Sequence, residues 1–145
     1  MKKIKYFAFA VAMLMLCMSV VSCGSASKKV ETTFTVSLVL NDAPYIDGYT
    51  YTIKRSEDDP ATILDAVREA LQAVDVETTI DESGFLANVI VDGTVYANFA
   101  TEEEYVYSWI YTVDGQSAPG KASDVQIKEG WHIIYTYTKA PLEEE

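Results

Sequence analysis

The sequence is poor in the residues from which catalytic and metal sites are most often built. It contains one histidine and two cysteines among 145 residues. A multi-histidine metal centre, a cysteine-rich zinc site and a disulfide framework are therefore excluded. Basic residues are scarce, 11 against 22 acidic ones, and the net charge of −11 argues against nucleic acid as a partner. No Gly-rich phosphate loop, Gly-x-Ser-x-Gly or metalloprotease motif occurs, so we expect a protein that is not an enzyme.

The first 22 residues have the features of a bacterial lipoprotein signal peptide. Three lysines lie within the first five residues, and no charge follows from Tyr6 to Met18. This apolar run is too short for a full membrane span. Val20-Val21-Ser22-Cys23 then fits a lipobox, in which Cys23 takes a diacylglycerol and becomes the new N-terminus. An ordinary signal peptide, or an uncleaved anchor with a chance cysteine, is the alternative.

A lipidated Cys23 predicts a protein held on the extracytoplasmic face of the cell membrane. It would carry at least two acyl chains, which suffice for stable anchoring, and no free thiol would remain. Residues 23–30 would form the lipidated cysteine and a flexible tether. The tether is short, because six such residues span only about 13 Å. Whether the membrane is an inner or an outer one is left open.

The mature part reads as one α+β domain over residues 31–138, followed by an acidic tail at 139–145. Alternation of apolar and polar residues predicts strands at 33–40 and 49–53, with turn residues at 41–44 and 47–48. Further strands are predicted at 84–91, 105–113 and 131–138, two of them ending in Asp-Gly turns.

A single amphipathic helix is predicted between the second and third strands. Thr62 can cap it and Asp65 is placed for a capping box. Its apolar residues recur at steps of three and four and mark one buried stripe, formed by Leu64, Val67, Leu71 and Val74. The helix should end near residues 73–75. One such helix can cover one face of a sheet, which predicts a β-grasp-like mixed sheet with one packed helix.

The second half of the chain also carries a series of family motifs. They are Val89-Ile90-Val91-Asp92-Gly93, the segment from Trp109 to Gly115, Gly120-Lys121-Ala122, and the segment from Ile127 to Ile133. Together with Ala61–Val67, this series resembles the bacterial surface domain of unknown function that is named for the transcobalamin C-terminal domain. The resemblance covers roughly residues 33–138 and implies a β-grasp-like fold. In transcobalamin and intrinsic factor the related domain closes over cobalamin, so the resemblance implies a corrinoid or other small ligand.

The candidate binding residues lie on the last two long strands and on the turn between them. Aromatic residues alternate along 105–113 and 131–137, which gives an aromatic face that is either core or a contact surface. The Asp114-Gly115 turn can equally be plain turn geometry or contact a ligand. The predicted ligand-binding residues are Trp109, Tyr111, Asp114, Gly115, Trp131 and Tyr135.

The remaining polar clusters favour structural roles. The acidic runs 57–59 and 102–104 could offer oxygen ligands to Ca²⁺, but neither matches an EF-hand loop, and solvated loops are the preferred interpretation. His132 has no second histidine or cysteine for a metal, and no nucleophile or oxyanion site is identified beside it. We therefore predict no metal site and no resident cofactor, with cobalamin considered as a ligand.

Two main functional hypotheses follow. The first is a lipid-anchored, extracytoplasmic module that binds or hands over a corrinoid or other small ligand, with a second protein covering the ligand's other face. The second is an interaction or accessory domain of a cell-surface or transport complex that takes no small ligand. A purely structural surface module is a third interpretation.

Overall fold

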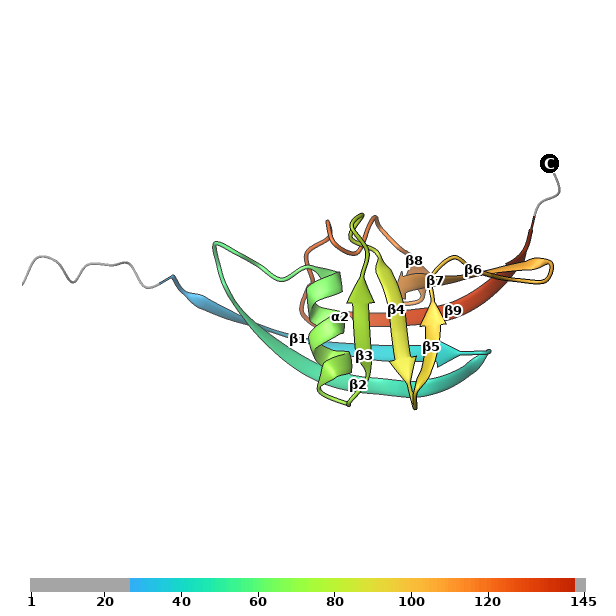
Figure 1. Ribbon diagram of the computed structural model, residues 1–145. Helices are drawn as coiled ribbons and strands as arrows, with labels where there is room; N and C mark the ends of the chain where they lie inside the picture. Colours follow the sequence, from blue (N-terminus) through green and yellow to red (C-terminus); the bar gives the residue numbers. More distant parts are fainter. Residues whose placement is uncertain (1–26, 143–145) are drawn as a thin grey trace, which may run out of the picture.

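The described residues, 27–142, form two β-sheets and one helix in a computed structural model (Figure 1). The predicted signal peptide and Cys23 lie outside these residues. The elements are β1 (Lys29–Leu40), β2 (Ala43–Ser56), α2 (Ile63–Gln72), β3 (Glu77–Ile80), β4 (Leu86–Val91), β5 (Thr94–Ala97), β6 (Ala100–Glu102), β7 (Tyr105–Val113), β8 (Gln116–Ser117) and β9 (His132–Pro141). Within this part of the chain, no helix has the length and apolar character needed to cross a bilayer.

The large sheet has the order β2-β1-β9-β7-β6, and β8 pairs with the end of β7. The first and last strands, β1 and β9, are parallel neighbours, whereas the other pairs are antiparallel. The sheet is therefore mixed, which confirms the predicted α+β class. β1 lies inside the sheet because its apolar face supplies part of the core, with Phe34, Val36 and Leu38 at most 1% exposed.

The first hairpin closes over a tighter turn than the sequence predicts. Asn41 and Asp42 have φ angles of 50° and 63°, and Leu40 pairs with Ala43. Positive φ at both central residues is the mark of a type I′ turn. The second predicted turn, at Asp47-Gly48, lies inside β2, because register shifts opposite residues 36–39 let the strand continue through it. Gly48 takes a φ of 70° there.

The helix α2 forms where it was predicted. Thr62 and Asp65 make the complete capping box, which confirms that part of the prediction. The first helical amides meet a long loop, since Ile63 N–H donates to the carbonyl of Val125 at 2.8 Å and Leu64 N–H to that of Ala122 at 3.0 Å. The N-terminus of the helix is thereby tied to the segment that precedes β9.

A second, three-stranded sheet lies beside the helix. Its central strand, β4, was predicted, whereas β3, β5 and their assembly into a separate sheet were missed by the sequence analysis. The strand order is β3-β4-β5, and Figure 1 shows α2, β3, β4 and β5 side by side over one face of the large sheet. The core lies between these two layers. Residues from both layers are fully buried there: Leu38, Ile63, Val67, Val89 and Ile133.

The last strand runs further than its predicted end at residue 138. β9 continues to Pro141, and Lys139 and Pro141 pair with Tyr107 and Tyr105 of β7. Leu142 N–H then donates to the carbonyl of Glu104 at 2.8 Å. The first residues of the segment expected as an acidic tail, 139–141, therefore belong to the sheet. At the other end of the domain, β1 begins at Lys29, inside the segment expected as a tether.

Candidate ligand-binding site

The β7–β8 hairpin carries two of the six predicted site residues at its tip. Asp114 and Gly115 have φ angles of 51° and 76°, and Val113 pairs with Gln116 across the turn. Asp114 also fixes the start of β9. Its N–H donates to the carbonyl of His132 at 2.8 Å, and its Oδ1 accepts the N–H of His132 at 2.9 Å. The Asp114 carboxylate therefore has a structural function in holding the hairpin against β9.

An open groove lies beside this hairpin, and we call it the Trp131 groove. Its volume is about 600 Å³, and it is lined by Val113, Asp114, Gln116, Ser117, Pro119, Asp124, Val125, Gln126, Lys128 and Trp131. Trp131 is half-buried, and the Nζ of Lys128 lies 5.2 Å from the centre of its ring. The groove thus combines one aromatic surface with amide, hydroxyl and carboxylate groups. Its size falls within the usual range for small-molecule sites, about 300–1,000 Å³.

Three other predicted residues meet at a smaller depression, the Tyr111 cavity. It measures about 90 Å³ and is lined by Gly84, Phe85, Leu86, Asn98, Trp109, Tyr111, Gly120, Lys121, Ala122 and Tyr135. Tyr111 and Tyr135 stack there with ring centres 5.3 Å apart, and the Tyr111 hydroxyl donates to the carbonyl of Gly120. Burial raises the pKa of both phenols, and the negative charge that Tyr111 acquires when it ionises at alkaline pH adds to the rise at Tyr135. Both rings therefore stay neutral at physiological pH.

The aromatic face of β7 and β9 belongs largely to the core. Trp109 is 9% exposed and Tyr135 is 3% exposed. The Trp109 indole N–H donates to the carbonyl of Tyr96 in β5 at 2.9 Å, and the Trp109 backbone N–H donates to Asn98 Oδ1 at 3.0 Å. Trp109 therefore joins the two layers. The second sheet, which was not predicted, is what covers this face.

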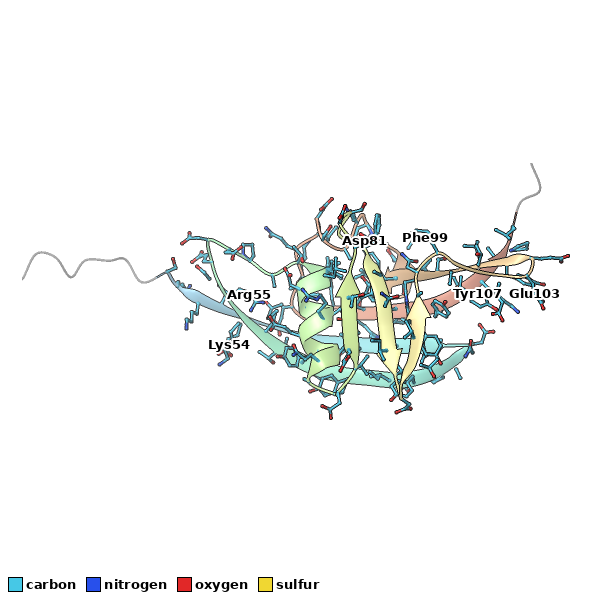
Figure 2. All side chains as sticks on the ribbon, in the orientation of Figure 1. Lys54, Arg55, Asp81, Phe99, Glu103 and Tyr107 are labelled. Carbon is cyan, nitrogen blue, oxygen red and sulfur yellow. The ribbon has the colours of Figure 1, made fainter. Side chains whose placement is uncertain are left out.

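Sequence reasoning missed two exposed aromatic residues, Phe85 and Phe99, which we call the aromatic rim. Phe85 lines the Tyr111 cavity and has the Nζ of Lys121 4.9 Å from its ring centre. Phe99 is 65% exposed and adopts a φ of 57°, a backbone region that costs bulky residues about 1–2 kcal/mol. It lies at the same end of the molecule as Asp81 (Figure 2). A left-handed phenylalanine between two short strands has no sequence signal by which it could have been found.

The loop that follows β8, at residues 118–126, connects the two depressions. Gly120, Lys121 and Ala122 line the Tyr111 cavity, whereas Pro119 and Asp124 line the Trp131 groove. The six predicted residues thus divide into three at the cavity, two at the groove, and Gly115 at the hairpin tip. The groove is the larger of the two and is bordered by the hairpin that the sequence analysis selected.

His132 has a partner that the sequence did not reveal. Its Nε2 lies 2.9 Å from Ser37 Oγ, and Ser37 also accepts the N–H of Gly48 at 2.9 Å. Ser37 is 4% exposed, so the pair fastens β9, β1 and β2 to one another. Among residues 27–142, no group of three or more His, Cys, Asp or Glu side chains is placed to hold a metal ion.

Comparison with known proteins identifies the fold and nothing finer. No family model matches the sequence, and no curated protein matches it. Among solved structures, haptocorrin in complex with Cbi aligns with a TM-score of 0.51 and 11% identity, over 83% of this chain and 28% of that chain. This chain is similar in fold to part of haptocorrin. It spans little more than a quarter of the haptocorrin chain.

A second solved structure is described as a "putative metal binding protein" from Ruminococcus gnavus ATCC 29149. It aligns with a TM-score of 0.41 and 17% identity, over 75% of this chain and 98% of that chain.

Proposed function

We propose that this chain is a lipid-anchored, extracytoplasmic binding module that takes a corrinoid at the Trp131 groove. The observation that carries the proposal is the groove itself, about 600 Å³ of open space beside the β7–β8 hairpin. The fold similarity to part of haptocorrin, a protein solved in complex with Cbi, supports the ligand class. The motif series at residues 89–133, which resembles the transcobalamin C-terminal domain, points to the same ligand class.

The chemistry of the groove suits one face of a large amphipathic ring system. Trp131 offers a flat apolar surface, and aromatic side chains bind such rings at low cost in conformational entropy. Gln116 and Gln126 offer amide donors and acceptors for the amide side chains that surround a corrin ring. Because the groove is open, it covers part of such a ligand, and a second protein covers the other face. The lipid anchor at Cys23 keeps the transfer of ligand between this chain and the second protein at the membrane.

Titration calorimetry of the full chain in detergent micelles, with cobalamin and cobinamide, tests the proposal. We expect saturable binding that Trp131→Ala weakens at least about tenfold, because removing a central aromatic anchor costs more than about 1.4 kcal/mol. Ile110→Ala is the matched control. Ile110 is 50% exposed and lies outside the groove, so its removal should leave affinity unchanged. No heat of binding at millimolar corrinoid would refute the proposed ligand class.

A second candidate function, docking of a surface or transport protein, is favoured by the aromatic rim. Phe85 is 44% exposed and Phe99 is 65% exposed, and large exposed aromatics are typical anchors of protein interfaces. Cross-linking of intact membranes separates the two functions. Docking at the rim requires a cross-linked product that Phe99→Ala removes and Trp131→Ala leaves in place.

A further inference from the structure

The Tyr111 cavity lies where the two layers meet the loop at residues 118–126, and it has room for a small ligand only. Its walls come from the start of β4, from β7 and β9, and from the loop. Four aromatic rings line it, those of Phe85, Trp109, Tyr111 and Tyr135. Its volume of about 90 Å³ equals that of about three water molecules at about 30 Å³ each. A corrin ring is therefore too large for this cavity.

One wall of the cavity carries a lysine that has no anionic partner. Lys121 is the only half-buried lysine among residues 27–142, since the others are exposed. Its stem packs against Gly84, where an added Cβ would lie 3.6 Å from Cε, and its Nζ lies 4.9 Å from the centre of the Phe85 ring. Within the described residues Lys121 forms no ion pair, whereas Lys54 pairs with Glu31. Because lysine is rarely buried without a partner, its position indicates an anion that the chain itself does not supply.

The polar groups of the cavity that remain free are hydrogen-bond donors. The hydroxyl of Tyr111 and the indole N–H of Trp109 already donate to backbone carbonyls. Asn98 Oδ1 accepts the backbone N–H of Trp109, which leaves the two N–H groups of Asn98 Nδ2, and Lys121 adds the three of its ammonium group. No carboxylate of the described residues lines the cavity. The complementary ligand therefore accepts hydrogen bonds and carries negative charge.

We propose that the Tyr111 cavity binds a short-chain monocarboxylate, such as acetate or propionate. An ionised carboxyl group only accepts hydrogen bonds, so it matches the ammonium group of Lys121 and the amide N–H groups of Asn98. The short apolar chain of the acid matches the rest of the lining, which consists of the aromatic rings, Leu86, Ala122 and two glycines. A doubly charged anion such as phosphate would turn charge towards these apolar walls at a high cost in desolvation.

The carboxylate site is separate from the site proposed for a corrinoid. The Tyr111 cavity and the Trp131 groove share no lining residue. Binding of the acid requires neither the lipid anchor nor a second protein. Because so small a ligand makes few contacts, we expect a dissociation constant of about 0.1–5 mM.

Nuclear magnetic resonance of the isotope-labelled full chain in detergent micelles tests the proposal. The chain has two tryptophans, of which Trp109 lines the cavity and Trp131 lines the groove. We expect propionate to shift the indole N–H signal of Trp109 saturably and to leave that of Trp131 in place, and Trp131→Phe assigns the two signals. Propionamide, which has the same shape without the charge, should bind at least about tenfold more weakly. Sodium chloride at the same ionic strength controls for a general effect of salt.

Two lysine variants test the role of Lys121. Lys121→Gln removes the charge and keeps a stem that can pack against Gly84. It should weaken propionate binding at least about tenfold, as expected when a charge-assisted hydrogen bond is lost. Lys139→Gln is the matched control, because the Nζ of Lys139 also lies over an aromatic ring, 4.7 Å from the centre of Tyr105. Lys139 lies outside the cavity, so its replacement should leave propionate binding unchanged.

The proposal is overturned if the Trp109 signal stays in place at about 50 mM propionate, or if propionate and propionamide bind equally well. Equal binding of propionate by Lys121→Gln and Lys139→Gln would also overturn it. Should Lys121→Gln fail to fold, the comparison of the two ligands decides alone. The calorimetric test of corrinoid binding has its own variant, Trp131→Ala, so either proposal can fail without the other.

Discussion

At the scale of single residues, the structure separates the positions that hold the fold from those free to bind. Trp109 and Tyr135 are core residues, and the Asp114 carboxylate is occupied by the backbone of His132. Trp131 keeps an accessible ring in the groove. The sequence could locate these residue types on strands and turns. It could not say which aromatic face was covered, because only β4 of the covering sheet was predicted, and its short neighbours β3 and β5 were not.

The buried phenols lead to an expected pH dependence. The folded-state pKa of Tyr135 lies above its ordinary value of about 10, chiefly because of burial and then because of the Tyr111 charge. Because the pKa is raised in the folded state, the contribution of Tyr135 to stability is fully present below about pH 10. That contribution is lost as the pH rises from there towards the folded-state pKa. We expect the free energy of unfolding to fall by up to about 1.4 kcal/mol per pH unit for each such group.

Urea titrations between pH 8 and 12 measure this dependence. Tyr135→Phe should flatten the alkaline decline, whereas Tyr45→Phe should leave it as it is, since Tyr45 is 45% exposed. The same slope in all three proteins would show that burial of Tyr135 does not govern the alkaline limit.

At the scale of elements, strong periodic signals were reliable and short strands were not. The helix and its capping box were confirmed, because a 3-4-3 spacing of apolar residues and a Thr-x-x-Asp pair are local features. β3, β5 and β6 have three or four residues each. Each pairs with a strand that is its neighbour in the chain. A run of three or four residues, however, is too short to show a clear alternation of apolar and polar side chains.

The start of α2 gives a prediction at this scale. Thr62 Oγ1 accepts the N–H of Asp65 at 3.2 Å, and the Asp65 carboxylate accepts the N–H of Thr62 at 3.1 Å. We expect Thr62→Ala to lower the free energy of unfolding by about 1 kcal/mol, and Thr62→Ser to have little effect. Chemical denaturation provides the measurement. Hydrogen exchange of the Ile63 and Leu64 amides should quicken in Thr62→Ala alone, and equal exchange in both variants would argue against the cap.

At the scale of the whole molecule, two layers are joined by a few directed hydrogen bonds across an apolar core. The Trp109 indole reaches the carbonyl of Tyr96, and the Tyr137 hydroxyl reaches that of Ala97 at 2.9 Å. Both donors belong to the large sheet and both acceptors to β5. These bonds fix how the small sheet sits on the large one.

Replacing the indole tests this connection. Trp109→Phe keeps an aromatic ring but leaves the Tyr96 carbonyl without its donor, so we expect a loss of about 1–3 kcal/mol in the free energy of unfolding. Trp131→Phe, on the open groove, should cost less than half as much. Thermal and urea unfolding of both variants gives the comparison. A larger loss for Trp131→Phe would place the critical contact in the groove.

The parallel pairing of β1 with β9 has a consequence for how the molecule assembles. Ser37 and His132 meet across that pair although they are 95 positions apart in the chain. The strand at the middle of the large sheet is therefore the last one to be synthesised. Until β9 is in place, β1 of the first hairpin and β7 each have an unpaired edge. Pairing β9 with both of them joins segments from nearly the whole length of the domain. Such non-local closure is slow, in the range of milliseconds to seconds, and the incomplete sheet is the stage at which this protein is most exposed to aggregation and proteolysis.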